Sequence, residues 1–451
     1  MTSGKTIGPN VIVVFTDQQR WDSTGLHGNP MDLTPNLDRL AREGTHLAFT
    51  FTPQPLCTPA RSVMQTGLYP TTTGCFRNGV VLPKGTPTLA QVFGDAGYRT
   101  GYIGKWHLAD SEPVLEERRG GYQDWLGANA LEMVSDAYQC ELFDGDNNPV
   151  RLPGYRVDAL TDAAIRYVDM NRSRPFFLFL SYLEPHHQNN RDQFTPPIGY
   201  YERYLHAWTP PDLVALRGNA PGQLPGYYGT IKRIDEALGR LLDALYSLDL
   251  QDRTIVLFTS DHGCHFKTRN AEYKRSCHEA SIRVPAAIGG PGFSGGGQVK
   301  SLVSLLDIPP TLLDAAGLPI PDAMQGRSIL SRAVGGTTDT GDEVLIQISE
   351  SEVGRAVRTP RWKYGVHAPE QDPYRDMSAT QYQEQHLYDL AADPYELNDL
   401  IGLDSHREVC DVLRDRLLRL MQGAGESHCE IVRAEPRPGG RFRPTTAEAL
   451  Q

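Results

Sequence analysis

The segment PLCTPARSVMQTG, residues 55–67, places a cysteine at the expected start of a helix. Thr58 or Cys57 could cap that helix, Pro59 suits its first turn, and a glycine ends the segment. A side chain at a helix N-terminus lies at the positive end of the helix dipole, and Arg61 adds a cation one turn along. The pattern favours an anionic side chain or a bound oxyanion at position 57. The alternative is a small buried thiol at a turn.

Acidic and amide side chains follow two predicted buried strands. Asp17 ends the apolar run NVIVVFTD, and Gln18 comes directly after it. Asp261 and His262 end the later run RTIVLFTSDHG. Two carboxylates, an amide oxygen and an imidazole form a plausible ligand set for a divalent cation such as Ca²⁺ or Mg²⁺. Each acid alone is more often a helix cap or a surface charge, so this prediction depends on the residues meeting in space.

Three further segments could supply cations and proton carriers. Lys105 and His107 lie one residue apart in GYIGKWHL, so their side chains point the same way if that segment is extended. The motif EPHH contains His186 and His187, and Lys274 precedes another predicted strand. A single histidine or lysine is usually only a satisfied or solvated polar residue, so these residues gain weight only as a group.

The elements that must position these residues alternate between strand-like and helix-like patterns. The alternation predicts an α/β fold with a large, mostly parallel central sheet covered by helices on both faces. Ligands bind beyond the carboxyl ends of the strands in such sheets. The side chains expected to share that edge are Asp17, Lys105, His107, Glu184, His186, Asp261 and His262.

The chain divides into three predicted parts. Residues 8–335 form the catalytic domain, in which residues 188–228, rich in Pro, Gly and Tyr, are expected to be a long loop beside the substrate. Residues 342–430 form a smaller C-terminal α+β subdomain with an antiparallel sheet. Residues 431–451 form an extended tail.

Composition excludes several classes of function. The net charge of −11 over 451 residues argues against a nucleic-acid partner. No apolar run approaches the roughly 18 residues of a membrane span, and no cleavable secretion signal is visible. The seven cysteines are odd in number and include no CxxC pair, which favours a reduced, cytoplasmic protein without a zinc ribbon. The oligomeric state cannot be predicted from these features.

Together the motifs resemble one family. CTPAR matches the signature of the type I, formylglycine-dependent sulfatases of the alkaline-phosphatase-like superfamily. The resemblance continues through PNVIVVFTDQQRWD, TPNLDRLAREG, GYIGKWHL, PFFLFLSYLEPH, VLFTSDHG and LYDLAADPYELNDL, and it covers nearly the whole chain in the right order. It implies hydrolysis of a sulfate monoester of a sugar, aryl or alkyl alcohol, releasing the alcohol and inorganic sulfate.

The resemblance also implies a modified residue and a metal. A formylglycine-generating enzyme would convert Cys57 to formylglycine (3-oxoalanine), whose aldehyde hydrates to a geminal diol. Ca²⁺, with Mg²⁺ or Mn²⁺ as alternatives, would be held by Asp17, Gln18, Asp261, His262 and residue 57. A thiol is a poor ligand for a hard cation and a diol oxygen is a good one, so unmodified cysteine would be the unsuited member of this set.

Roles for the remaining residues follow from the same resemblance. A diol oxygen, acidified by the cation and by Arg61, attacks sulfur, while Lys105 and Lys274 balance the charge of the sulfuryl oxygens. His186, preferred over its neighbour His187, or Lys274 protonates the leaving alcohol. His107 then takes the proton of the second diol hydroxyl, and sulfate leaves.

Two alternatives stay open at this level. The first is a phosphonate monoester or phosphodiester hydrolase on the same scaffold, although Lys105 and His107 favour the sulfatase. The second is a sulfate-ester binder that never acquires formylglycine. The family often has Asp-Asp where this chain has Asp17-Gln18, and Asn where it has His262. The predicted site therefore carries two formal negative charges rather than three, which affects the expected metal preference.

Overall fold

The computed structural model describes residues 8–333, 342–439 and 442–451, and its largest element is an 11-stranded mixed sheet. The order across the sheet is β11 (Gly297–Ser304), β2 (Thr45–Phe51), β10 (Ala286–Gly289), β8 (Thr254–Ser260), β1 (Asn10–Asp17), β7 (Phe176–Pro185), β3 (Arg99–Lys105), β4 (Asp124–Ala128), β5 (Cys140–Phe143) and β6 (Pro149–Leu152), with β9 (Arg283–Val284) beside β2. The five central strands β8, β1, β7, β3 and β4 are parallel. The prediction of a mostly parallel central sheet is confirmed.

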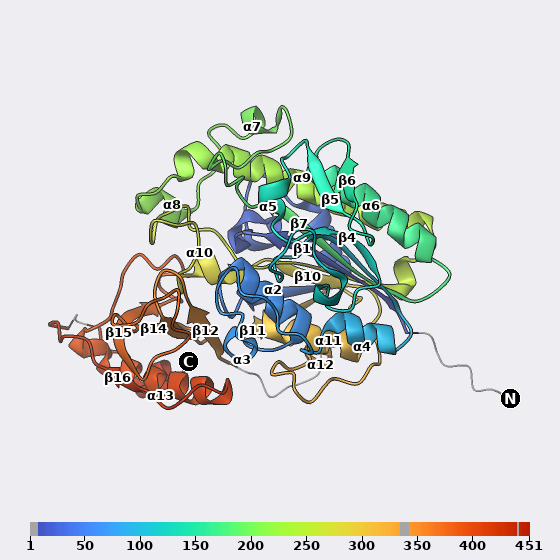
Figure 1. Cartoon of the computed structure of the whole chain (residues 1–451). Coiled ribbons are helices and arrows are strands. Elements are labelled where there is room, and N and C mark those ends of the chain that lie inside the picture. Colours follow the sequence, from blue (N-terminus) through green and yellow to red (C-terminus); the bar gives the residue numbers. More distant parts are fainter. Residues whose placement is uncertain (1–7, 334–341, 440–441) are drawn as a thin grey trace.

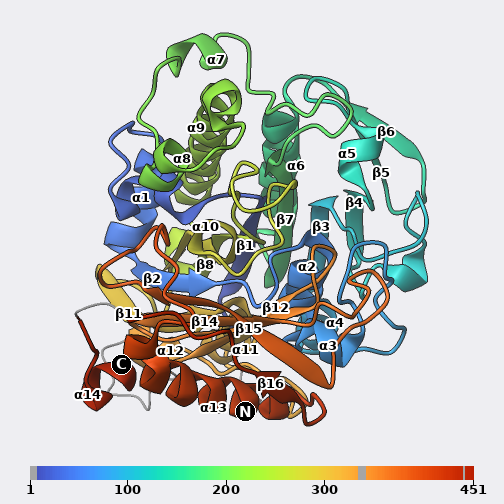
Figure 2. The ribbon, with the colours of Figure 1, turned by 90° about the vertical axis from the view of Figure 1, so that its left-hand side faces the viewer.

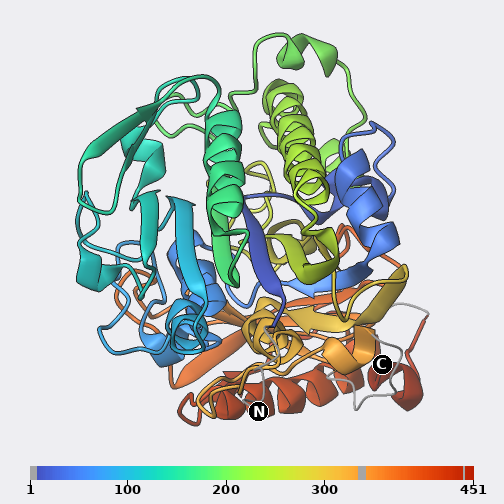
Figure 3. The ribbon, with the colours of Figure 1, turned by 90° about the vertical axis from the view of Figure 1, so that its right-hand side faces the viewer.

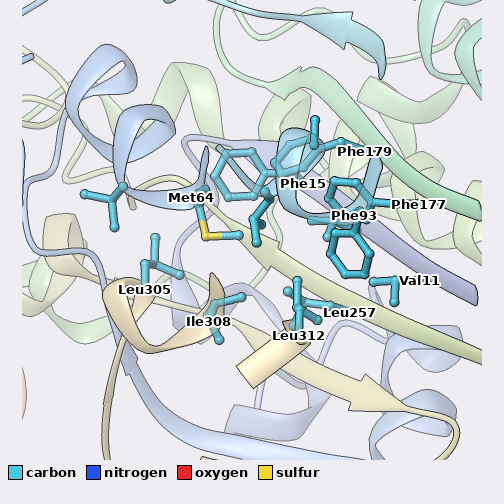
Figure 4. Close-up of a cluster of buried hydrophobic side chains, with 14 of the residues drawn as sticks. Val11, Phe15, Met64, Phe93, Phe177, Phe179, Leu257, Leu305, Ile308 and Leu312 are labelled. Carbon is cyan, nitrogen blue, oxygen red and sulfur yellow. The ribbon is translucent and has the colours of Figure 1, made fainter. Parts of the chain in front are cut away.

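Helices cover both faces of this sheet (Figure 1). One face carries α1 (Pro35–Glu43), α6 (Arg156–Asn171) and α9 (Ala220–Ser247), and the other carries α2 (Cys57–Thr66), α4 (Leu89–Asp95), α11 (Ile308–Ala315) and α12 (Leu330–Ala333). Alternate residues of β1 divide between the two cores, as strand geometry requires. Val11 and Phe15 pack with Met64 of α2 in the core shown in Figure 4, whereas Ile12 and Val14 belong to the core under α6 and α9.

A second sheet of five strands follows in the C-terminal part. Its order is β12 (Val344–Ile348), β13 (Gly354–Arg358), β14 (Trp362–His367), β15 (Gln381–Asp389) and β16 (Glu430–Val432). All neighbours are antiparallel except β15 and β16, and α13 (Arg407–Gly423) packs on the sheet. Most of the predicted boundary, at residues 334–341, lies outside the described residues. The predicted extended tail differs from expectation, because it begins within β16 and contains α14 (Thr446–Ala449).

A buried ion cluster joins the two sheets. Lys363 of β14 places its Nζ atom 2.8 Å from Glu279 Oε1 in α10 (Glu279–Ile282) and 2.6 Å from Glu396 Oε1. The lysine side chain is fully buried and the two carboxylates nearly so. Figures 2 and 3 show the C-terminal sheet and α13 at the opposite end of the molecule from α7 (Tyr200–Arg203).

The prediction of a long loop at residues 188–228 is wrong for part of that segment. It contains α7 and α8 (Pro211–Ala215), and α9 already begins at Ala220 although Pro225 lies inside it. A side chain at Gly226 would collide with the carbonyl oxygen of Phe194, so this glycine serves a close helix–loop contact rather than a turn. Tertiary packing therefore overrides the local helix-breaking signal. Within the described ranges, no helix is long and apolar enough to cross a bilayer.

Candidate active site

Four neighbouring parallel strands deliver the predicted site residues to one edge of the main sheet. Asp17 ends β1 and Lys105 ends β3, while His186 and Asp261 come directly after β7 and β8. Cys57 is the first residue of α2 and its N-cap is Leu56, so the prediction that Thr58 or Cys57 caps this helix is wrong. The Thr58 hydroxyl instead donates to the carbonyl oxygen of His107, at 2.9 Å.

A compact group of potential metal ligands surrounds Cys57. One ligand atom from each of Asp17, Cys57, Asp261 and His262 lies within 4.8 Å of the others, and all four residues are buried. The Cys57 Sγ atom is 3.6 Å from Asp17 Oδ1 and 3.4 Å from His262 Nε2. The structure therefore brings together four of the five predicted metal ligands, from β1, α2 and the end of β8.

The fifth predicted ligand, Gln18, is fixed by its backbone. Its φ is +68°, its N–H donates to Asp261 Oδ1 at 3.0 Å, and its carbonyl accepts from the Tyr227 hydroxyl at 2.9 Å. Two buried oxygens, Gln18 Oε1 and Asp261 Oδ2, have no hydrogen-bond partner among the described residues. Buried acceptors without a donor are costly, and a hard divalent cation would satisfy both. The donor set therefore fits such an ion.

Charges within this group are strongly coupled. Burial opposes ionisation of Asp17, but the charges of Lys105, His186 and Arg61 outweigh it and hold the pKa of Asp17 well below its usual range. Burial and the neighbouring Asp17 charge raise the pKa of Asp261 to about 7. The Arg61 guanidinium, 3.6 Å from Asp261 Oδ2, does not offset burial and the Asp17 charge, so a bound cation would favour the ionised form of Asp261.

The Cys57 thiol is itself acidified. Burial and Asp17 oppose its ionisation, but Lys105 and Lys274 outweigh them and lower the pKa of Cys57 to about 7. The Lys274 Nζ atom lies 3.0 Å from Cys57 Sγ and 3.1 Å from His262 Nε2. Lys105 and Lys274 therefore stabilise negative charge at this position, whereas the sequence expectation rested on the helix start and Arg61.

The other two cations are held in fixed orientations. The guanidinium of Arg61 donates to Asp17 Oδ2 at 2.9 Å, to Ser181 Oγ at 2.7 Å and to the carbonyl of Lys105 at 2.8 Å. The Lys105 Nζ atom lies 2.9 Å from Asp17 Oδ2. Gly104, at φ +109°, lets the end of β3 approach the Ser181 backbone where any side chain would collide. The sequence analysis did not predict Ser181 as a site residue. The available signal was that Ser181 is the only serine or threonine in the apolar segment PFFLFLSYL.

The histidines differ in their surroundings. His186 Nδ1 lies 2.6 Å from the carbonyl of His187, so a neutral ring keeps Nε2 free. His187 stacks on His186 and also packs on Tyr273. His107 has a φ of +61°, so the expected extended alternation from Lys105 does not continue to it. Its ring nevertheless helps to lower the pKa of the Cys57 thiol.

Glu132 is a buried part of the site that the sequence does not reveal. It lies on α5 (Leu131–Val134), with Oε1 3.1 Å from Lys105 Nζ and 4.0 Å from His107 Nε2. Burial opposes its ionisation, but Lys105 and His107 lower the pKa of Glu132 to about 2. Glu184, which was expected at the site edge, pairs instead with Arg156 at 2.8 Å.

Known proteins of one family are similar to this chain over most of its length. The Sulfatase family matches residues 9–318, and the family described as N-sulphoglucosamine sulphohydrolase, C-terminal, matches residues 271–423. An ulvan-active sulfatase of Formosa agariphila is 30% identical over 442 residues, covering 93% of this chain and 82% of the relative. Human arylsulfatase A is 28% identical over 449 residues, covering 87% and 83%.

The fold is also that of solved structures. One, determined in complex with its substrate D-glucosamine-2-N,6-O-disulfate, superimposes with a TM-score of 0.76 at 23% identity. The match covers 93% of this chain and 98% of the other. At this level of identity the likeness concerns the fold: a large sheet flanked by helices, with a smaller C-terminal sheet.

Proposed function

Because this chain belongs to the sulfatase family and is a sulfuric-ester hydrolase, we propose that it acts through formylglycine at position 57. One observation carries the proposal: Cys57 begins α2 among two carboxylates, an imidazole and the Lys274 ammonium. A formylglycine-generating enzyme would be the partner in maturation. Hydrolysis of phosphonates or phosphodiesters is not favoured, because the similar curated proteins are named as sulfatases.

The proposed metal is Ca²⁺, with Mg²⁺ and Mn²⁺ as alternatives. Asp17, Gln18, Asp261 and His262 would hold it together with the modified residue 57, which supplies oxygen in place of sulfur. When bound, the ion would acidify the hydrated aldehyde, whose oxygen is the proposed nucleophile, and would polarise the sulfate group. The two unpartnered oxygens of Gln18 and Asp261 support this assignment.

The cationic side chains are proposed to receive the sulfate. Lys105 and Lys274 reach the Cys57 Sγ atom, at 3.8 and 3.0 Å, so both lie where sulfuryl oxygens would be placed. Arg61 is bound to Asp17, Ser181 and a backbone carbonyl and so keeps a fixed charge behind residue 57. Such preorganised charge stabilises a transition state without reorganisation during the reaction.

Proton transfer is assigned to three residues. The ammonium of Lys274, or His186 when its ring also carries a proton at Nε2, would protonate the departing alkoxide oxygen. His107 would accept the proton whose loss frees sulfate from residue 57, and the carboxylate of Glu132 would stabilise the resulting imidazolium. The substrate class that we propose is a sulfated saccharide, supported by the neighbour solved with a glucosamine disulfate.

Mass spectrometry and kinetics test this proposal together. Protein from its native host should give a peptide in which Cys57 is replaced by an aldehyde or its hydrate, and a Cys57→Ala variant should be inactive. The native protein should also show a higher kcat/KM on an aryl sulfate than on the matching aryl phosphonate. An unmodified thiol in fully active protein would refute the formylglycine assignment, and preference for the phosphonate would refute the ester class.

A further inference from the structure

A polar hollow opens beside the site, on the side of α5. It has a volume of about 490 Å³ and is lined by Glu132, Met133, Val134, Ser135, Asp136, Gln139, Gln188, Asn189 and Asn190. Hollows of about 700 Å³ exist elsewhere, but no residue of the proposed catalytic site lines them. Figure 2 shows α5 next to β4 and β5, on the flank of the main sheet.

Glu132 lines the hollow and also belongs to the proposed catalytic site. Its Oε1 atom lies 3.1 Å from Lys105 Nζ, and that Nζ lies 3.8 Å from Cys57 Sγ. The opposite wall belongs to the segment that starts at His186 and reaches Asn190 four residues later. The hollow therefore adjoins Glu132, which contacts Lys105 of the site, and the segment that follows His186, a proposed donor to the leaving oxygen.

The floor of the hollow is rigid. Gln188 donates from Nε2 to the carbonyls of Glu132 and Ser135, at 2.9 and 3.1 Å, and its Oε1 accepts from Arg156. The Gln188 backbone N–H also donates to the carbonyl of Gln193, at 2.8 Å. A binding surface held in place in this way loses little entropy when a ligand arrives.

The rim, in contrast, offers free polar groups. Asn189 and Asn190 are exposed, and neither carboxamide has a hydrogen-bond partner in the part of the chain that is described. Each carboxamide has donors and an acceptor, which matches a hydroxyl that both gives and receives a hydrogen bond. The exposed Met133 side chain adds an apolar contact, while among the described residues no aromatic ring lines the hollow.

We propose that this hollow is the leaving-group subsite and that it takes a neutral, hydroxyl-rich alcohol, namely a saccharide unit, through Asn189 and Asn190. The inference rests on the proposed sulfatase function and refines its substrate class. Two carboxylates, those of Glu132 and Asp136, line the hollow, and no lysine or arginine among the described residues does; the nearby cations Lys105 and Arg191 are already paired with these carboxylates. Additional negative charge on the leaving group would therefore be disfavoured.

A double variant separates sugar recognition from chemistry. In Asn189→Ala/Asn190→Ala, kcat/KM on the monosulfated hexose that the native enzyme hydrolyses fastest should fall about tenfold or more. The value on 4-nitrophenyl sulfate, which has no hydroxyls to lose, should change by less than about twofold. Asn148→Ala is the matched control, because it removes an exposed carboxamide from the turn between β5 and β6. It should leave both substrates unaffected.

The remaining outcomes distinguish failure of the subsite proposal from failure of the proposed function. Equal losses on both esters, or no loss on either, would overturn the subsite. So would a native enzyme that hydrolyses the aryl sulfate but no member of a panel of monosulfated hexoses. A native enzyme with mature residue 57 that hydrolyses no sulfate ester would refute the proposed function itself, independently of the two asparagines.

Discussion

Replacing Glu132 with Gln should slow catalysis without weakening the binding of sulfate. The carboxylate lies between the Lys105 ammonium, at 3.1 Å, and the His107 ring, at 4.0 Å. Glutamine keeps nearly the same shape and one acceptor oxygen, so the substitution removes the charge and little else. Lys105 would still be paired with Asp17, at 2.9 Å, and would not become an isolated buried charge.

The size of the effect follows from the change in hydrogen-bond type. A hydrogen bond between ions contributes about 1.5–3 kcal/mol and a neutral one about 0.5–1.5 kcal/mol, so the loss is about 1–2 kcal/mol. If that loss falls on the transition state, kcat should drop about 5- to 30-fold. A negative charge beside an anion site opposes sulfate binding, so its removal should leave the inhibition constant of inorganic sulfate unchanged or lower it.

Steady-state kinetics on an aryl sulfate, with inorganic sulfate as a competitive inhibitor, would measure both quantities. The matched control is Glu112→Gln. The Glu112 carboxylate accepts from the N–H groups of Asn129 and Ala130, next to α5, and does not contact the lysine. The Glu112→Gln variant should retain the native kcat. The reasoning is refuted if Glu132→Gln raises the sulfate inhibition constant in step with the fall in kcat, because general damage to the site would do the same.

Three further predictions concern the metal, pH and the junction between the sheets. Chelation should abolish turnover and Ca²⁺ should restore it, and Asp261→Asn should retain less metal by elemental analysis; full activity in metal-free protein would contradict the site. Burial and the Arg283 charge lower the pKa of His46 from 6.5 to about 4. The contribution of the neutral His46 ring to the free energy of unfolding is complete above pH 6.5 and is lost as the pH falls, by about 2 kcal/mol at pH 5. His46→Gln should therefore lose less stability than the native protein between pH 7 and 5 in denaturant titrations, and equal slopes would exclude this contribution. Lys363→Met removes the cation beside the buried Glu396, while Glu279 keeps Arg358 at 3.3 Å, and should cost about 3–5 kcal/mol; an unchanged unfolding midpoint would argue against the ion cluster.

The sequence predicts the site best where local pattern and sheet topology agree. Asp17 and Asp261 each end a strongly apolar run, and parallel strands end at the same edge, so their meeting follows from the fold class alone. Cys57 could be placed because Pro59 and a terminal glycine mark the helix that it begins. For these residues no knowledge of side-chain packing is needed.

Residues that act through distant packing could not be found in this way. Glu132 lies in a four-residue helix without periodicity, and its contact with Lys105 depends on how β4 runs beside β3. The start of α9 was missed because Pro225 and nearby glycines are typical of loops, whereas here they permit close contacts with the segment around Phe194. Local propensity is a weak guide once tertiary contacts decide the conformation.

The burial of Cys57 limits the time during which it could be modified. The residue is 1% exposed in the folded protein, so the proposed modifying enzyme must reach it earlier. Its closest cation, Lys274, is 217 residues further along the chain. At a synthesis rate of roughly 5–20 residues per second, about 10–40 seconds pass before the ribosome has even made that partner. The order of residues along the chain would thus leave the cysteine accessible during translation, and the proposed conversion would compete with the speed of elongation rather than with the stability of the finished fold.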